Sequence, residues 1–430
     1  MKKYELEDND ENIKNSISFD ILEKNNKLIN FMKFVNNMQE NYTISVDGSW
    51  GCGKTFFIKQ LMYLRNNSII VTNLDEKSKQ IIDDFRSKYY IVYYNAWEND
   101  DHNDPLESLI FNILNTLPNY SDTFIDGSET FELVKKSLIN FIEVSSLGII
   151  KSDDIKEMKT FSKLAESVNT IEEKKKALFD LLSVLSKHKR ILLIIDELDR
   201  CKPDYAVKMI ETIKHFYINK NITSVVVTNN NQLSKTIKKF YGNEFDGYSY
   251  LNKIYDAVIT LQSDNIEKYA QTYLGINKST NLPEDMTMFL FRHYLFSYRE
   301  CNKYMSMYRL VLPYIHYEYK FHPNSFIDES CVFLPLSICL KIKDIYMYED
   351  FINGKGEDIL KQLFNTSQMQ NENKELYEWL CEIFKVEKDK ELIDSVLINY
   401  KKIFIKGGYK FDKYPFLEAV SMVGNLINVD

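Results

Sequence analysis

The segment from Gly48 to Thr55 has residue types and a spacing that suit the binding of phosphate. It consists of GSWGCGKT, in which a glycine is followed by four residues, then glycine, lysine and threonine. Glycines allow the backbone to curl so that successive N–H groups face one anion, and the positive end of a following helix adds to the attraction. Lys54 would then reach the β- and γ-phosphates of a nucleotide, and the Thr55 hydroxyl would bind Mg²⁺. We therefore predict nucleotide contacts for Gly48, Ser49, Trp50, Gly51, Cys52, Gly53, Lys54, Thr55 and Phe56.

Two side chains inside this loop need an interpretation of their own. Trp50 either covers the nucleotide or packs against the edge of a sheet, and packing is the favoured alternative. In loops of this kind the side chain at the position of Cys52 points away from phosphate, so we expect no redox role for its thiol.

A second group of polar residues follows the apolar run of ILLIIDELDR. Five apolar residues place Asp196 at the carboxyl end of a buried strand, which is where open α/β sheets bind their ligands. A carboxylate at that point would orient Mg²⁺ together with Thr55. Either Glu197 or Asp199 could polarise an attacking water, and Glu197 is favoured. If the strand continued, Glu197 and Asp199 would share one of its faces.

Arg200 closes this acidic cluster and has two interpretations. It pairs with Glu197 or Asp199 inside the chain, or it directs its charge at the γ-phosphate of a neighbouring subunit. The internal ion pair is favoured.

The elements that must position these groups alternate between strand and helix patterns. Such alternation predicts an α/β fold in which helices cover a parallel sheet. The expected strands lie within Tyr42–Gly48, Tyr89–Trp97, Arg190–Arg200, Ile222–Asn230 and Tyr255–Leu261. Residues from about 105 to 187 are too many for one crossover and predict a helical insertion. We expect a nucleotide-binding domain over residues 1–270 and a mostly helical lid and C-terminal domain over 271–430.

Composition and charge narrow the classes of function that the chain could have. The net charge of −8 gives no general support for nucleic-acid binding, although a local basic groove would be compatible with it. The six cysteines have no C-x-x-C spacing, so no disulfide framework or zinc site is predicted. Without a signal-like or membrane-length apolar run, we expect a cytoplasmic protein that has no membrane partner.

Taken together, the motifs GSWGCGKT, YYNAW, IIDELDRC and FYGNEFDGYSYLNKIYD resemble the KAP family of P-loop NTPases over roughly residues 20 to 310. The resemblance implies Mg²⁺-dependent NTP hydrolysis, a strand order of 5-1-4-3-2, a helical insertion and a helical lid. It assigns the Walker A residues to Gly48, Gly53, Lys54 and Thr55, and the Walker B residues to Asp196, Glu197 and Asp199. The segment SYRECNKYM is similar to the lid helix of the family, which implies that Arg299 lies near the γ-phosphate; otherwise Arg299 braces the helical domain.

The chain departs from the family pattern at two points. Many members carry transmembrane helices in the insertion, and this chain has none there. Where members commonly have an acidic residue after the fourth strand, this chain has VVTNNNQL. Thr228 or Asn229 would then be the polar sensor of the γ-phosphate or the attacking water. The chain also lacks the N-K-x-D tetrad with which many GTPases recognise guanine, which favours ATP.

The function that we expect is an ATPase switch, in which ATP binding draws the helical domain onto the sheet. The catalytic residues would be Lys54, Glu197, Asp199 and Arg299. The family resemblance implies a role in bacterial defence against phages, with self-association or a separate effector as partner. The alternatives are an ATP-binding scaffold with little turnover, a P-loop kinase and a nucleic-acid motor.

Overall fold

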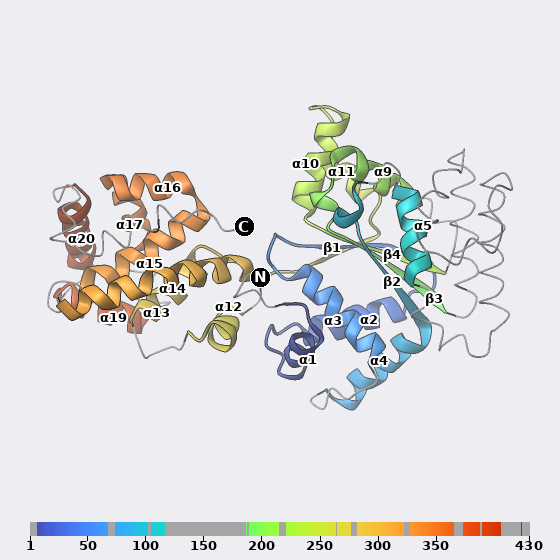
Figure 1. Cartoon of the computed structure of the whole chain (residues 1–430), viewed down its shortest axis with the longest axis horizontal. Coiled ribbons are helices and arrows are strands. Elements are labelled where there is room, and N and C mark those ends of the chain that lie inside the picture. The colour runs from blue at the N-terminus through green and yellow to red at the C-terminus, as the bar shows by residue number, and fades with distance from the viewer. Residues whose placement is uncertain are drawn as a thin grey trace. The chain divides into compact units, whose positions relative to one another are not determined.

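The computed structural model describes residues 7–67, 74–101, 105–116, 186, 189–214, 221–263, 265–276, 282–321, 327–364, 373–387, 389–405 and 423 of the 430-residue chain. The chain divides into two compact units (Figure 1). The sheet unit comprises residues 8–20 and 24–262. The helical unit comprises residues 1–7, 21–23 and 263–430.

The sheet unit is built on five parallel strands in the order β2-β3-β4-β1-β5. This order confirms the predicted fold class and topology. Their bounds are β1 (Thr43–Asp47), β2 (Tyr89–Asn95), β3 (Arg190–Asp196), β4 (Ile222–Thr228) and β5 (Ala257–Thr260).

The register of the strands brings their carboxyl ends to one edge of the sheet. Asn95 pairs with Asp196, and Asp47 pairs with Thr228. The three middle strands are buried almost throughout, and β4 consists mainly of β-branched residues (ITSVVVT). A strand buried on both faces is expected to be this apolar, so the polar residues that do occur at its end are placed there for a reason other than packing.

Helices cover both faces of the sheet (Figure 1). One layer contains α1 (Asp10–Ser18), α2 (Asn25–Asn36), α3 (Lys54–Asn66) and α4 (Glu76–Lys88). The other contains α5 (Pro105–Thr116), α9 (Pro203–Lys214), α10 (Asn230–Tyr241) and α11 (Gly247–Asn252). The apolar side of this second layer forms one continuous core with β2, β3 and β4. The predicted helical insertion begins with α5, and most of the rest of it lies outside the described residues.

The helical unit contains no strand among its described residues, which confirms a mostly helical C-terminal region. Aromatic side chains form much of its core, for instance Phe291 with Phe296 and Tyr304, and Phe351 with Tyr400 and Phe404. Its longer elements are α13 (Leu282–His293), α14 (Tyr298–Phe321), α15 (Ile327–Lys343), α19 (Lys374–Ile383) and α20 (Asp389–Tyr400). Shorter ones are α12 (Ile266–Tyr269), η7 (Ala270–Leu274), α16 (Ile345–Asp350), η8 (Phe351–Lys355), α17 (Glu357–Leu363) and η9 (Lys401–Ile405).

Within the described part of the chain, no helix combines the length and the apolar character needed to cross a membrane.

Candidate nucleotide-binding site

The loop between β1 and α3 has the curled backbone that its glycines predict. Gly51 and Gly53 have φ angles of 82° and 89°, in the left-handed region that favours glycine. At Gly48 a Cβ atom would lie 2.5 Å from the carbonyl oxygen of Leu261, so any side chain there would collide with backbone. α3 begins at Lys54, and its first N–H groups are therefore available at the loop.

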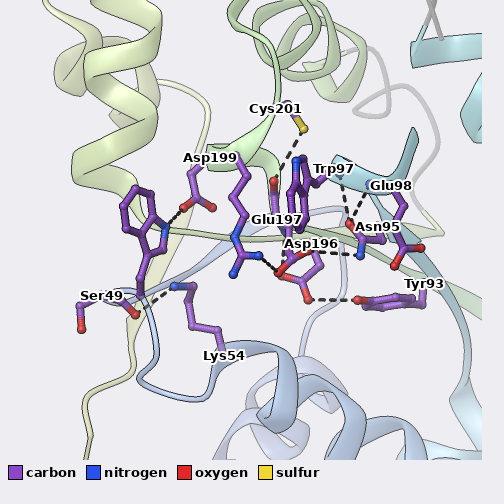
Figure 2. A network of polar contacts seen from close by, with 12 residues as sticks. Ser49, Lys54, Tyr93, Asn95, Trp97, Glu98, Asp196, Glu197, Asp199 and Cys201 are labelled. Carbon is purple, nitrogen blue, oxygen red and sulfur yellow. Dashed lines mark hydrogen bonds and ion pairs between the residues drawn. The ribbon is translucent and has the colours of Figure 1, made fainter. Parts of the chain in front are cut away.

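Lys54 lies over its own loop. Its Nζ donates to the carbonyl oxygens of Gly48 at 2.7 Å and Ser49 at 3.2 Å (Figure 2). These bonds hold the ammonium group beside the curled backbone. A positive charge in that position suits an anion bound by the loop N–H groups.

A buried lysine outside the loop also supports it. Lys24 is 1% exposed, and its Nζ donates to the carbonyl oxygen of Cys52 at 2.6 Å. The Cys52 side chain is itself fully buried. Sequence reasoning missed Lys24 because nothing in its neighbourhood distinguishes it from a surface lysine.

Asp196 ends β3 and is 1% exposed. Its carboxylate accepts hydrogen bonds from the Tyr93 hydroxyl at 3.1 Å and from the Glu197 N–H at 2.8 Å, and the Thr55 hydroxyl lies close enough to lower its pKa. Burial is the main cause that raises the pKa of Asp196 to about 6, and the Thr55 hydrogen bond opposes it. The structure thus brings Thr55 and Asp196, the two predicted magnesium ligands, close together.

The donors at this point fit Mg²⁺ bound together with a nucleotide. Mg²⁺ prefers hard oxygen ligands and is usually held by one or two carboxylates plus substrate phosphates. A hydroxyl and a buried carboxylate supply that set. Among the described residues, no group of three or more His, Cys, Asp or Glu side chains forms a metal cage of its own.

Glu197 follows Asp196 but does not continue the strand. Its φ is 60°, and Leu198–Arg200 form a 3₁₀ turn, η5. The strand ends at Asp196, as predicted, so the condition under which Glu197 and Asp199 would share a strand face is not met. The Glu197 side chain is 15% exposed, and its carboxylate accepts from Arg200 at 2.8 Å and from Asn95 at 3.3 Å. The predicted internal ion pair of Arg200 is confirmed.

Trp50 connects the loop to the acidic cluster. Its indole Nε1 donates to Asp199 Oδ2 at 2.5 Å, and the side chain is 47% exposed. The side chain thus reaches the turn that follows β3, and the choice between packing at the sheet edge and covering a nucleotide stays a prediction. The Asp199 carboxylate, which is nearly buried, is engaged by this bond.

The two candidate sensor residues differ in what their side chains do. Asn229 Oδ1 caps α10 by accepting from the Gln232 N–H at 3.2 Å. Thr228 is buried at the end of β4, and within the described residues its hydroxyl has no partner. Its carbonyl oxygen accepts from the N–H of Gly48, at the start of the loop. Among the described residues, Thr228 therefore offers a buried hydroxyl without a partner next to the phosphate loop, whereas the amide oxygen of Asn229 is used by its helix cap.

Arg299 lies on α14 of the helical unit. Its place at the γ-phosphate stays a prediction.

Sequence reasoning also gave no role to two residues of β2. Tyr93 bonds to Asp196, and Asn95 bonds to Glu197. A signal for Asn95 was present in the motif YYNAW, whereas Tyr93 stands in an apolar run in which its hydroxyl carries no pattern.

The comparisons with known proteins agree with this geometry. A family model described as the KAP family P-loop domain matches residues 24–281, more than half of the chain. No curated protein matches the sequence significantly.

Proposed function

Because the chain belongs to the KAP family of P-loop domains, we propose that it is an Mg²⁺-dependent ATPase that uses hydrolysis as a conformational or assembly switch. The observation that carries the proposal is the convergence of Lys54, Thr55, Asp196 and Glu197 at one edge of the sheet. In this proposal residues 1–270 form the hydrolysing domain, and residues 271–430 form the lid and C-terminal region.

The loop and Lys54 bind the triphosphate. Successive N–H groups between Gly48 and Thr55 donate to the phosphate oxygens, and the ammonium of Lys54 contacts the β- and γ-phosphates. Thr55 and Asp196 would hold the magnesium ion. Mg²⁺, when bound, neutralises charge that develops on the phosphate oxygens.

Glu197 is the proposed base. It accepts a proton from water while the water oxygen attacks the γ-phosphorus, and the bond from that phosphorus to the bridging oxygen of ADP breaks. Asp199 is the weaker candidate, because its carboxylate is bonded to Trp50. Thr228 is the proposed sensor, because its buried hydroxyl has no other partner in the described part of the chain.

ATP is proposed as the nucleotide because the chain lacks the guanine-recognition tetrad. The switch would couple the site to the helical unit through Arg299. Anti-phage defence, and self-association or a separate effector, rest on the family resemblance and are part of this proposal. Cytoplasmic location, which was expected from the sequence pattern, is also part of it.

A scaffold that binds ATP but turns it over slowly is the second candidate. It is favoured by one observation: both oxygens of the Glu197 carboxylate are already bonded, to Arg200 and to Asn95. Such bonds would slow hydrolysis if they withheld the base from water.

Phosphate release from ATP, measured with and without Mg²⁺, tests the proposal. Turnover should require Mg²⁺ and should be lost in Lys54→Ala and in Asp196→Ala. Lys79→Ala, at a surface lysine on α4 that forms a salt bridge with Glu76, is the matched control. Turnover that survives both site variants would refute the assigned site. A phosphorylated acceptor among the products would point to a kinase instead.

A further inference from the structure

Two motifs of the sequence meet at the carboxylate of Glu197. YYNAW supplies Asn95, whose Nδ2 lies 3.3 Å from Glu197 Oε2. DELDRC supplies Arg200, whose Nη1 lies 2.8 Å from Oε1. Each carboxylate oxygen therefore has one partner and, with two lone pairs, room for one more. Figure 2 shows Asn95 and Glu197 facing each other across the ends of β2 and β3.

The orientation of Asn95 is fixed by its own turn. Its Oδ1 accepts from the backbone N–H groups of Trp97 at 3.1 Å and Glu98 at 3.4 Å. Because the amide oxygen is used in this way, the amide nitrogen must face the other side, where Glu197 lies. Asn99 adds a further tie by donating to the Asn95 carbonyl at 2.7 Å.

Arg200 is fixed by an aromatic ring. Its guanidinium lies 5.1 Å from the centre of the Trp97 ring. Trp97 is 50% exposed, so burial in the core does not account for a tryptophan at this point. A cation over an indole face contributes about 0.5–1 kcal/mol at an exposed site.

The Glu197 backbone makes such side-chain support necessary. With a φ of 60°, Glu197 stands in a turn rather than in the strand, so the pleat of β3 does not set the direction of its side chain. Left-handed backbone at a residue other than glycine costs on the order of 1 kcal/mol and persists where the surroundings impose it. The bonds from Asn95 and Arg200 supply the direction that the strand no longer gives.

We propose that Asn95 and Arg200 are positioning residues that hold the Glu197 carboxylate in place to accept a proton from water, and that Trp97 holds Arg200. The inference rests on the proposed ATPase function. It assigns one task to two motifs that nucleotide binding leaves unexplained. Neither side chain bonds to the phosphate loop in the described residues, so the effect of removing them falls on kcat and leaves nucleotide affinity unchanged.

A double-mutant cycle tests this inference. Asn95→Ala and Arg200→Ala are each made in the natural chain and in a Glu197→Gln chain, and kcat is measured beside the Kd of a fluorescent ATP analogue. In the natural chain each substitution should lower kcat about tenfold or more, with Kd within about twofold. In the Glu197→Gln chain neither should lower kcat further, because the group that they position is gone.

Three further variants control the cycle. Lys202→Ala removes an exposed neighbour of Arg200 that pairs with Asp101, and should leave kcat unchanged. Asn95→Asp keeps the size of the side chain but replaces the donor, and should lose as much activity as Asn95→Ala. Arg200→Lys keeps the charge and should recover part of the loss.

The outcomes separate the inference from the function. If Glu197→Gln itself leaves turnover intact, Glu197 is not the base and the inference fails, while the proposed ATPase function stands; if the natural chain releases no phosphate from ATP, the proposed function itself fails. If Glu197→Gln abolishes turnover but the other losses are equal in both chains, only the positioning role is overturned. A rise of kcat in Arg200→Ala would also overturn it, because the ion pair would then restrain the base.

Discussion

The two sides of the site are held in different ways. On the loop side, Lys54 bonds to carbonyl oxygens only five and six residues before it. On the carboxylate side, Asp196 and Glu197 are held by Tyr93 and Asn95, which lie 103 and 102 residues earlier in the chain. The loop thus carries most of its geometry within one short motif. The carboxylates depend on the register between two neighbouring strands.

This difference predicts a division of labour. Substitutions on the loop side should weaken nucleotide binding. Substitutions on the carboxylate side should leave binding largely intact and change turnover or the stability of the nucleotide-free protein.

The largest effect is expected for Lys54→Ala. The variant should bind ATP about 100-fold more weakly, because a charge-assisted contact to the phosphates is lost. Titration calorimetry of ATP with Mg²⁺ measures this, with Lys79→Ala as the control. Unchanged ATP affinity would contradict the assignment of nucleotide binding to the loop side.

Lys24→Met tests the one described contact to the loop that comes from a lysine outside the motif. The buried carbonyl of Cys52 would lose its donor, so the free energy of unfolding should fall by about 2 kcal/mol. Thermal unfolding measures the fall, and ATP affinity should decrease with it. Lys33→Met, at an exposed lysine in the last turn of α2, serves as the comparison; an equal loss there would contradict a specific brace.

Asp196→Asn should raise the free energy of unfolding at neutral pH, whereas Lys24→Met should lower it. The pKa of Asp196 is raised from 3.8 to about 6 by burial, so the folded chain keeps its proton longer than the unfolded chain does. The contribution to stability is complete below about pH 4 and is lost as the pH rises through 6. At pH 7.5 the nucleotide-free variant should therefore be more stable by about 1–2 kcal/mol, after loss of hydrogen-bond strength.

Unfolding of both proteins between pH 4.5 and 7.5 tests this. The natural chain should lose stability relative to Asp196→Asn across this window, and the variant should hydrolyse no ATP. A parallel pH dependence of the two proteins would show that Asp196 does not carry the shifted titration.

The smallest effect is expected where the two sides are joined. Trp50→Phe removes the indole N–H that donates to Asp199. Because Trp50 is half exposed, the free energy of unfolding should fall by no more than about 1 kcal/mol. Thermal unfolding measures it. A much larger loss would mean that this bond, and not the separate anchoring of each side, holds the site together.

The sequence predicted the parts of this site whose geometry is local. The curl of the loop follows from its glycines, and the place of Asp196 follows from the five apolar residues before it. The helical C-terminal region was predicted from the sequence pattern, whereas the strand order came with the family resemblance. The turn at Glu197 was missed because a residue with positive φ carries no signal when it is not glycine.

Contacts between distant segments were not predictable. Tyr93 looks like any aromatic residue of a buried strand until the register with β3 brings its hydroxyl to Asp196. In the sequence Lys24 resembles a surface lysine, whereas in the structure it stands at the start of α2 and its Nζ donates to the Cys52 carbonyl. The hydrogen bond from the Trp50 indole nitrogen to the Asp199 carboxylate likewise joins residues that are distant in the sequence.

The central claim is that one edge of the sheet both binds ATP and hydrolyses it, with separate groups for each task. Parallel measurement of ATP affinity and phosphate release in Glu197→Gln tests it most directly. We predict that affinity stays within about twofold of the natural chain while release falls by at least about 100-fold. Undiminished release in this variant, or no ATP binding by the natural chain, would contradict the claim.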